Sequence, residues 1–319
     1  MGRVTLALLV MAILISPVYW EQARGAEKLK YSVSFREGVS QALPVATALE
    51  QGFWKQEGLD IEYVPFKSGS QMLRAMASGH IKIGTDNAPG VIRGASRGVP
   101  IIMVSIIQTG SDWAIWVLPG GPIRKPEDLK GKKIGMSRRG GTSDAYARMT
   151  VKNLGIEKDV RIIAVGGSRA RVAALTTGVI DAFPQAMSSA APMVIKGMVR
   201  RLIDIGKQLP QPWIDQAVVA LKEFVKTNPE LARKAIRGIS KAGAYIGANH
   251  DYAVRKVMSL KGYDRATAEL ALKGIAYSGN PVIDRAGVVN VRGFLLEYGL
   301  IKAAEAPPVD ELYTNELVK

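Results

Sequence analysis

The spacing of apolar positions changes along the chain between the period of a strand and that of a helix. Leu29 to Phe35 alternates polar and apolar residues, which predicts a strand, and Leu43 to Glu57 has the spacing of a helix. A second strand is predicted at Ile61 to Phe66, a second helix at Ser70 to Ser78 and a third strand at Ile81 to Gly84. This part of the chain therefore forms a β-α-β-α-β unit.

The same order of elements returns about one hundred residues later. The segment Ala75–Ile81 even matches Ala174–Ile180 in its pattern of small, apolar and glycine positions. Strands that alternate with helices predict parallel sheets with right-handed crossovers, so two such units predict two similar lobes. The elements of the second unit are strands at 133–137, 160–165 and 179–183 and helices at 142–154 and 168–177.

After Asp215 the pattern becomes mainly helical. One further strand is predicted at Gln216 to Leu221, and Asn228-Pro229-Glu230 has the residue types of a helix start. The predicted helices that follow are 229–246, 252–260, 265–277 and 287–298.

The first residues form a separate pattern. Arg3 precedes an apolar run from Leu6 to Ile15, and small residues follow near Gly25. This is the pattern of a secretory signal peptide, and the run is shorter than the roughly 20 residues of a membrane span. We therefore predict a signal peptide at residues 1–25, with an uncleaved N-terminal anchor as the alternative.

The amino-acid composition excludes several kinds of functional site. The chain has no cysteine, which excludes disulfides, thiol nucleophiles, cysteine-bound zinc and a lipid-modified cysteine. Its net charge is +15, and removal of Arg3, Arg24 and Glu21 with the signal peptide leaves 15 − 2 + 1 = +14. The basic residues are scattered and form no stripe with aromatic residues, so we expect no nucleic acid. The positive charge fits either an anionic ligand, which we expect, or a simple effect on solubility.

Polar loops follow the predicted strands of both units. In parallel α/β sheets, ligands bind at the carboxyl ends of strands, and hydroxyls, glycines and free N–H groups at helix starts suit an anion. The candidate ligand-binding residues are Ser34, Phe35, Ser68, Gly69, Ser70, Asp86, Asn87, Arg138, Gly141, Thr142, Ser168, Gln185 and Trp213.

Some of these candidates have a purely structural alternative. Ser70, Thr142 and Ser168 are also suited to cap helices. Asp86-Asn87 could form only a turn, and Trp213 is either an aromatic wall of the cleft or a buried packing residue.

We expect no catalytic residue, metal or cofactor. The only histidines, His80 and His250, have no carboxylate or second histidine at ligand spacing. The common nucleophile-elbow, phosphate-loop and zinc-protease motifs are absent.

Three segments carry a family resemblance. Pro44–Glu62, with Gly-Phe-Trp and Glu-Gly-Leu inside it, resembles the taurine-, alkanesulfonate- and nitrate-binding proteins of ABC importers, whose superfamily includes pyrimidine-precursor binding and synthesis proteins. Asp128–Gly135 and Ala174–Ala182 are similar to the entry and the Gly-x-x-Asp-Ala segment of the family's second lobe. Lys82 stands where the first-lobe motif normally has Asp, and this adds positive charge there.

The resemblance implies an α/β type II periplasmic-binding-protein fold, with two β-α-β lobes, a central cleft and a hinge. Crossings are expected near Thr109–Trp113 and near Glu223. The first lobe would comprise residues 26–112 and 223–319, and the second residues 113–222.

The resemblance also implies a periplasmic, monomeric solute-binding protein without catalysis, which delivers a small ligand to an ABC transporter permease. The main alternative is a pyrimidine-precursor-type enzyme or binder of the same fold. The pyrimidine-synthesising members carry a cysteine-rich motif that this chain lacks. A sensor domain that presents a loaded lobe to a membrane kinase is a third possibility.

Overall fold

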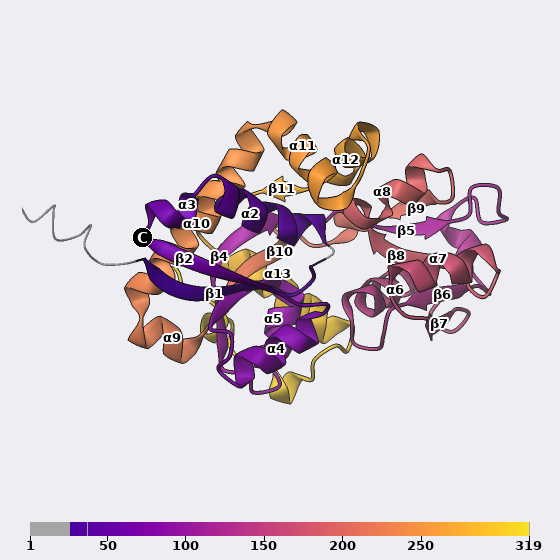
Figure 1. The fold of residues 1–319 in the computed structure, drawn as a ribbon. Coiled ribbons are helices and arrows are strands. Elements are labelled where there is room, and N and C mark those ends of the chain that lie inside the picture. Colours follow the sequence, from indigo (N-terminus) through magenta and orange to yellow (C-terminus); the bar gives the residue numbers. More distant parts are fainter. Residues whose placement is uncertain (1–25, 37, 319) are drawn as a thin grey trace, which may run out of the picture.

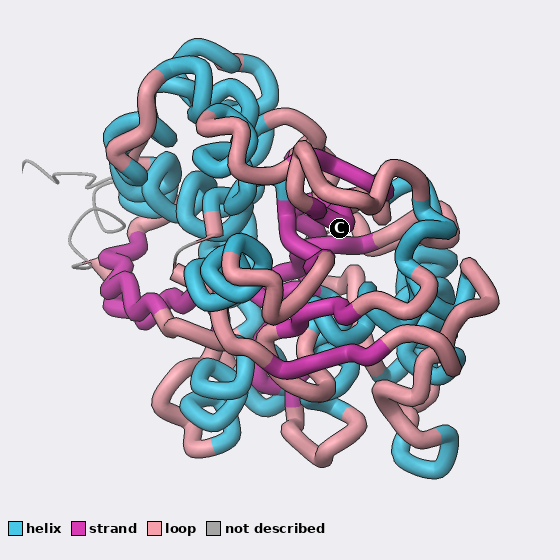
Figure 2. The backbone as a smooth tube through the Cα atoms, turned by 90° about the vertical axis from the view of Figure 1, so that its right-hand side faces the viewer, coloured by secondary structure: helices cyan, strands magenta, loops and turns pink. Residues whose placement is uncertain are grey.

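The computed structural model describes residues 26–36 and 38–318, which form two lobes side by side (Figure 1). The predicted signal peptide at residues 1–25 lies outside the described residues. Within the described part, no helix is both long and apolar enough to cross a membrane. Figure 2 shows strands through the middle of the molecule with helices on either side.

The first lobe is built on a six-stranded sheet in the order β11-β4-β10-β3-β1-β2. β1 pairs in parallel with β2 and β3, and β10 pairs antiparallel with β3 and β4. The strands are β1 (Glu27–Val33), β2 (Leu59–Pro65), β3 (Ile83–Asn87), β4 (Ile101–Thr109), β10 (Ile214–Leu221) and β11 (Ala276–Tyr277).

The second lobe repeats this arrangement in a five-stranded sheet, in the order β7-β6-β8-β5-β9. β6 pairs in parallel with β7 and β8, and β5 pairs antiparallel with β8 and β9. The internal repeat in the sequence therefore corresponds to two sheets of one topology. The strands are β5 (Trp113–Val117), β6 (Lys133–Met136), β7 (Arg161–Ala164), β8 (Ala182–Ala186) and β9 (Arg200–Asp204).

Helices cover both faces of the first sheet. α4, α5 and α13 pack on one face, and α2, α3 and α10 pack on the other. The helices are α2 (Val39–Glu50), α3 (Phe53–Gln56), α4 (Gly69–Ala77), α5 (Ala88–Ala95), α6 (Thr142–Asn153), α7 (Ser168–Thr176), α8 (Met187–Ile195), α9 (Lys222–Thr227), α10 (Pro229–Ala248), α11 (His250–Lys261), α12 (Arg265–Leu272) and α13 (Arg285–Glu297), with 3-10 turns at Pro126–Leu129, Gly206–Gln208, Ala303–Glu305 and Val309–Glu311.

The chain crosses between the lobes twice. The first crossing, residues 110–112, joins β4 to β5, and the second, residues 205–213, joins β9 to β10. The expected second crossing near Glu223 is wrong, because residues 214–221 form a strand of the first sheet rather than of the second lobe. In each sheet, the strand that directly follows a crossing, β10 or β5, runs antiparallel to both of its neighbours.

Glycines set two helix boundaries differently from the sequence pattern. The predicted helix 43–57 is two helices, because Gly52 adopts a left-handed conformation with φ +68° after α2. The predicted helix 265–277 stops at Leu272, since Gly274 has φ +89° and residues 276–277 then pair with β4.

One glycine of α10 allows a close contact in the first-lobe core. Trp54 is buried, and its Nε1 donates to the carbonyl of Ala235 at 2.9 Å. A Cβ at Gly238 would lie 2.1 Å from the Trp54 ring, so Gly238→Ala is expected to destabilise the protein by about 1–3 kcal/mol in urea unfolding. Gly247→Ala in the same helix meets no atom within 4 Å and should stabilise slightly, by up to ~1 kcal/mol. Equal stability of the two variants would contradict this packing.

Candidate functional site

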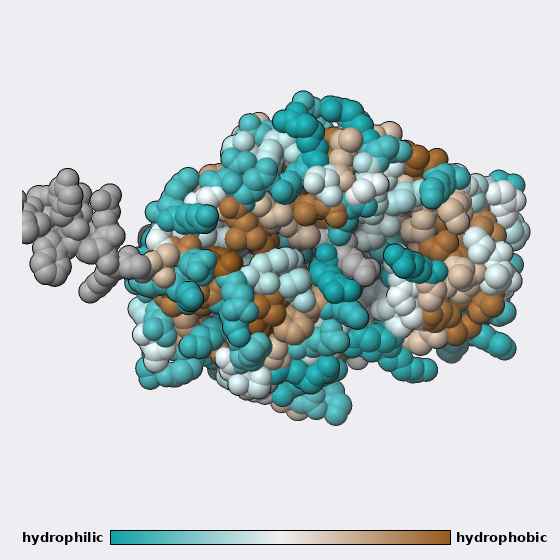
Figure 3. Space-filling model, viewed as in Figure 1, coloured by the Kyte–Doolittle hydropathy of each residue, from teal (hydrophilic) through white to brown (hydrophobic). Residues whose placement is uncertain are grey.

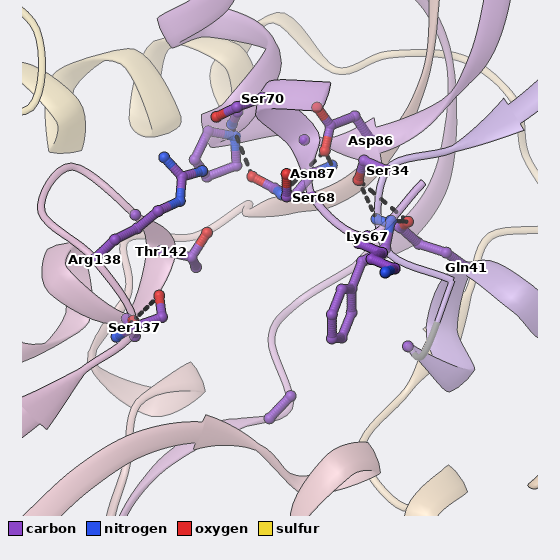
Figure 4. A pocket seen from close by; sticks show the side chains of 18 of the residues that line it. Ser34, Gln41, Lys67, Ser68, Ser70, Asp86, Asn87, Ser137, Arg138 and Thr142 are labelled. Carbon is purple, nitrogen blue, oxygen red and sulfur yellow. Dashed lines mark hydrogen bonds between the residues drawn. The ribbon is translucent and has the colours of Figure 1, made fainter. Parts of the chain in front are cut away.

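The candidate site is a cleft of about 780 Å³ between the two lobes. It is lined by the loops after β1, β2 and β3 on the first lobe and by those after β6, β7 and β8 on the second. These are the carboxyl ends of the parallel strands, where α/β sheets bind ligands. In Figure 4, Arg138 and Thr142 of the second lobe lie opposite Ser68 and Ser70 of the first.

The structure places every sequence-predicted site residue at this cleft except Trp213. Trp213 is 1% exposed and packs edge-on against Phe294, with ring centroids 5.3 Å apart. Its role is therefore packing at the second crossing, and the aromatic-wall interpretation is not supported. Trp113, by contrast, does line the cleft.

The starts of α4, α6 and α7 border the cleft without a side-chain cap. The N-cap residues of α4, α6 and α7 are Ser68, Gly141 and Gly167, and no side chain of these accepts a capping hydrogen bond. Ser70, Thr142 and Ser168 lie in the first turns or at the first positions, so the alternative that they act as caps is wrong. The hydroxyls and the first N–H groups of these helices are available to an anion.

Asp86, at the end of β3, is a buried carboxylate of the first lobe. Its Oδ1 accepts hydrogen bonds from the backbone N–H and side-chain amide of Asn87, at 2.8 and 3.1 Å, while Oδ2 has no partner. Burial raises the pKa of Asp86 to about 6, and the Ser34 hydroxyl, the Asn87 N–H and the charges of Arg93 and Arg138 oppose this rise. Asn87 also caps α5 by accepting from the N–H of Gly90 at 2.7 Å.

Arg93 joins the lobes across the cleft. It lies on α5, is 9% exposed, and its guanidinium donates to the carbonyl of Gly140 in the loop before α6. Burial lowers the pKa of Arg93 to about 10, while the charge of Asp86 raises it. Asp86 and Arg93 thus partly compensate each other's charge.

Arg171 lies beneath the second-lobe side of the cleft. Its side chain extends from α7, is 5% exposed, and donates to the carbonyl of Pro184 and to Oε1 of Gln185. Its Nε has no partner, and none of its described contacts is to a carboxylate. Burial lowers its pKa to about 10. Arg171 is therefore a buried cation without a counter-charge.

A buried amide network forms part of the floor. Oε1 of Gln41 accepts from the N–H of Phe35 at 2.8 Å, and Nε2 of Gln41 donates to Oε1 of Gln216 at 2.8 Å. Gln216 in turn donates to Asp215 Oδ2 at 3.0 Å. The network fixes the loop after β1 against β10, close to the second crossing.

Two carboxylates lie at the hinge, one beside each crossing, and we call Asp112 and Asp215 the hinge carboxylates. Both line the cleft. Burial raises the pKa of Asp215 to about 7, and the charge of Asp112 raises it further. Burial also raises the pKa of Asp112, whose Oδ2 accepts from the N–H of Ser188 at 2.9 Å.

Sequence reasoning missed several polar residues of the cleft that lie outside the loops after the parallel strands. A polar residue within an otherwise apolar stretch is the signal that could have found Gln41, Asp215 and Gln216, whereas Arg171 resembles any exposed arginine of a helix. The missed residues include Gln41, Arg93, Asp112, Tyr146, Arg171, Ser188, Asp215 and Gln216.

Other features considered in the sequence analysis are Lys82 and a possible metal site. Lys82, at the position where the motif normally has Asp, is exposed and lies 5.9 Å from the ring centroid of Phe224. No group of three or more His, Cys, Asp or Glu side chains within residues 26–36 and 38–318 could hold a metal ion. Figure 3 shows polar residues spread over both lobes of the viewed face.

Comparison with known proteins identifies a family. The model of the NMT1/THI5-like family matches residues 39–253, which is more than half of the chain. The taurine-binding periplasmic protein of Escherichia coli is 26% identical over 259 residues, covering 79% of each chain. The 4-amino-5-hydroxymethyl-2-methylpyrimidine phosphate synthase THI13 of Saccharomyces cerevisiae is 22% identical over 232 residues, covering 69% of this chain and 67% of the yeast protein.

The fold also has solved relatives. The periplasmic aliphatic sulphonate binding protein of Escherichia coli superposes with a TM-score of 0.73 at 17% identity, over 90% of this chain and 91% of the other. This likeness confirms the predicted two-lobed periplasmic-binding-protein fold.

Proposed function

Because the chain belongs to the NMT1/THI5-like family, we propose that it is a periplasmic solute-binding protein that holds a small anionic molecule between its lobes and delivers it to an ABC importer. The names of the taurine- and sulphonate-binding relatives support a binding role for this fold. The signal-peptide pattern of residues 1–25 supports a location outside the cytoplasmic membrane. We propose that the protein acts as a monomer and docks on the membrane permease of the importer.

The main support for an anionic ligand is the buried guanidinium of Arg171. A buried guanidinium without a carboxylate partner is costly, and an anion in the cleft would supply the missing counter-charge. The uncapped starts of α4, α6 and α7 add N–H donors on both sides of the same cleft. Both lobes would thus contact one anion, which favours the closed arrangement when it is bound.

The residues that line the cleft give no support to the enzyme alternative. The yeast relative is a synthase, but neither cysteine nor histidine is among the residues that line the described cleft. A binding role is therefore the single function that we propose.

Arg138 and its neighbour Arg139 provide a matched test of the cleft. Both are exposed, but only Arg138 lines the cleft. We expect Arg138→Ala to weaken binding of a sulfonate or carboxylate roughly tenfold, because a charge-assisted hydrogen bond is lost. Arg139→Ala should leave the dissociation constant within about twofold by isothermal titration calorimetry. Equal effects of the two substitutions would remove Arg138 from the site.

A further inference from the structure

In the described part of the protein, no lysine or arginine pairs with either of the hinge carboxylates, although both line the cleft. Asp112 accepts from the N–H of Ser188, and Asp215 accepts from the amide of Gln216. Neither the hydrogen bonds nor the ion pairs described for these two side chains include a lysine or arginine. No hydrogen bond of the described part joins the two carboxyl groups, and burial and the charge of Asp112 raise the pKa of Asp215. This is unusual in a chain with 43 Lys and Arg against 28 Asp and Glu.

A second, independent observation at the same place is the hydroxyl of Tyr146. The residue is 1% exposed and lines the cleft, yet its hydroxyl has no hydrogen-bond partner. Burial raises the pKa of Tyr146, and the charges of Asp215 and Asp112 raise it further, while the side chains of Ser111 and Trp213 oppose the rise. A buried hydroxyl without a partner is normally satisfied by a bound group or water.

Arg171 and the hinge carboxylates lie in different parts of the cleft. Arg171 is held by the loop at Pro184 and Gln185 in the second lobe, whereas the hinge carboxylates lie beside the two crossings. The nearby charges that affect Asp86 are Arg93 and Arg138, so that carboxylate already has cations beside it. An anion alone would satisfy Arg171 but would leave the hinge carboxylates without a cationic partner.

We propose that the ligand is a zwitterion, whose acidic group faces Arg171 and the helix starts while a cationic nitrogen binds between Asp112 and Asp215. This inference rests on the proposed function and narrows its ligand class. An ammonium group offers several N–H donors, which suit two carboxylates and the oxygen of Tyr146. A cleft of about 780 Å³ is sized for an organic molecule rather than for a bare ion.

The test compares probes that differ only in the amine. Taurine is paired with ethanesulfonate, 3-aminopropanesulfonate with propanesulfonate, and γ-aminobutyrate with butyrate. Dissociation constants are measured by isothermal titration calorimetry on the purified protein. At least one amino probe is expected to bind ten or more times tighter than its partner.

Substitutions at the hinge then locate the amine. Asp112→Asn and Asp215→Asn keep an oxygen acceptor and should each reduce the advantage of the amino probe at least tenfold, without changing binding of the amine-free probe by as much. Asp181→Asn is the matched control, because Asp181 accepts from the N–H of Lys133 and does not line the cleft. Circular dichroism and melting curves confirm that each variant is folded.

Several outcomes would overturn the proposal. These are equal or tighter binding of the amine-free probes, an amine advantage that survives both hinge substitutions, and a failure of every amino probe to bind. If amine-free sulfonates bind and depend on Arg171, the solute-binding function stands while the zwitterion is rejected. If no probe of either kind binds, the anionic ligand fails as well.

Discussion

Arg171→Met is expected to weaken binding of an anionic ligand at least about 100-fold. The side chain is a buried cation beneath the cleft, and loss of one partner from a buried charge pair costs roughly 2–5 kcal/mol in binding. The substitution removes the cation and keeps an unbranched side chain of similar length. Isothermal titration calorimetry with the anion that binds the parent protein most tightly measures the loss.

The stability of the ligand-free variant separates a binding role from a purely structural one. Burying the guanidinium without a counter-charge is unfavourable, so we expect the melting temperature of the Arg171→Met variant to fall little or to rise. Arg169→Met, on the same helix but exposed and outside the cleft, is the control and should bind normally. Normal binding by a well-folded Arg171→Met variant would mean that this cation does not face the ligand.

The ligand-free protein should become less stable as the pH rises from 5 to 8. Asp86 and Asp215 have pKa values of about 6 and 7 in the folded protein, above the ordinary value of 3.8. The folded state therefore binds more protons than the unfolded state between these values, and stability falls with rising pH. The stabilisation is fully present below pH 4 and is lost as the pH passes through 6 to 7.

Asp215→Asn should remove much of this dependence. A rise in pKa from 3.8 to about 7 corresponds to ~4 kcal/mol, which is an upper limit because Asn also remains buried and polar. At pH 8 we expect the variant to be roughly 2 kcal/mol more stable than the parent, with near-equal stability at pH 4. Urea unfolding at both pH values measures the difference.

Other groups near Asp215 could also contribute to the pH dependence of stability. Asp112, Tyr146 and Gln216 are the groups that act on it or on its neighbour, and the charge of Asp112 also affects Tyr277. Asp181→Asn, away from the cleft, should keep the pH slope of the parent. An Asp215→Asn variant with an unchanged slope would show that Asp215 titrates normally.

The sequence predicts the repeated unit well because each of its signals is local. Alternation marks β1 and β6, and glycines mark the ends of the helices that follow, so the loops after the strands could be placed before the structure was known. Those loops contain the candidate residues from Ser34 to Gln185, all of which line the cleft. Contact of these residues with a ligand is part of the proposed function.

The positions of the two lobe crossings could not be predicted from such local signals. Residues 214–221 form an apolar strand that would suit either sheet, and only pairing with β3 and β4 assigns it to the first. The hinge carboxylates are far apart in sequence and come together because the chain crosses twice. Arg171 is hidden for a similar reason, since nothing in the pattern of α7 shows that its side chain reaches Pro184.

A thermal-shift screen of the purified protein tests most directly whether the cleft captures a small anion. The panel contains sulfonates, nitrate, aromatic carboxylates, amino acids and pyrimidines. A ligand that binds only the folded state must raise its melting temperature, so we expect one anionic class, with or without an amine, to raise it by several degrees. A cooperative melting curve that none of the anions shifts would contradict the account.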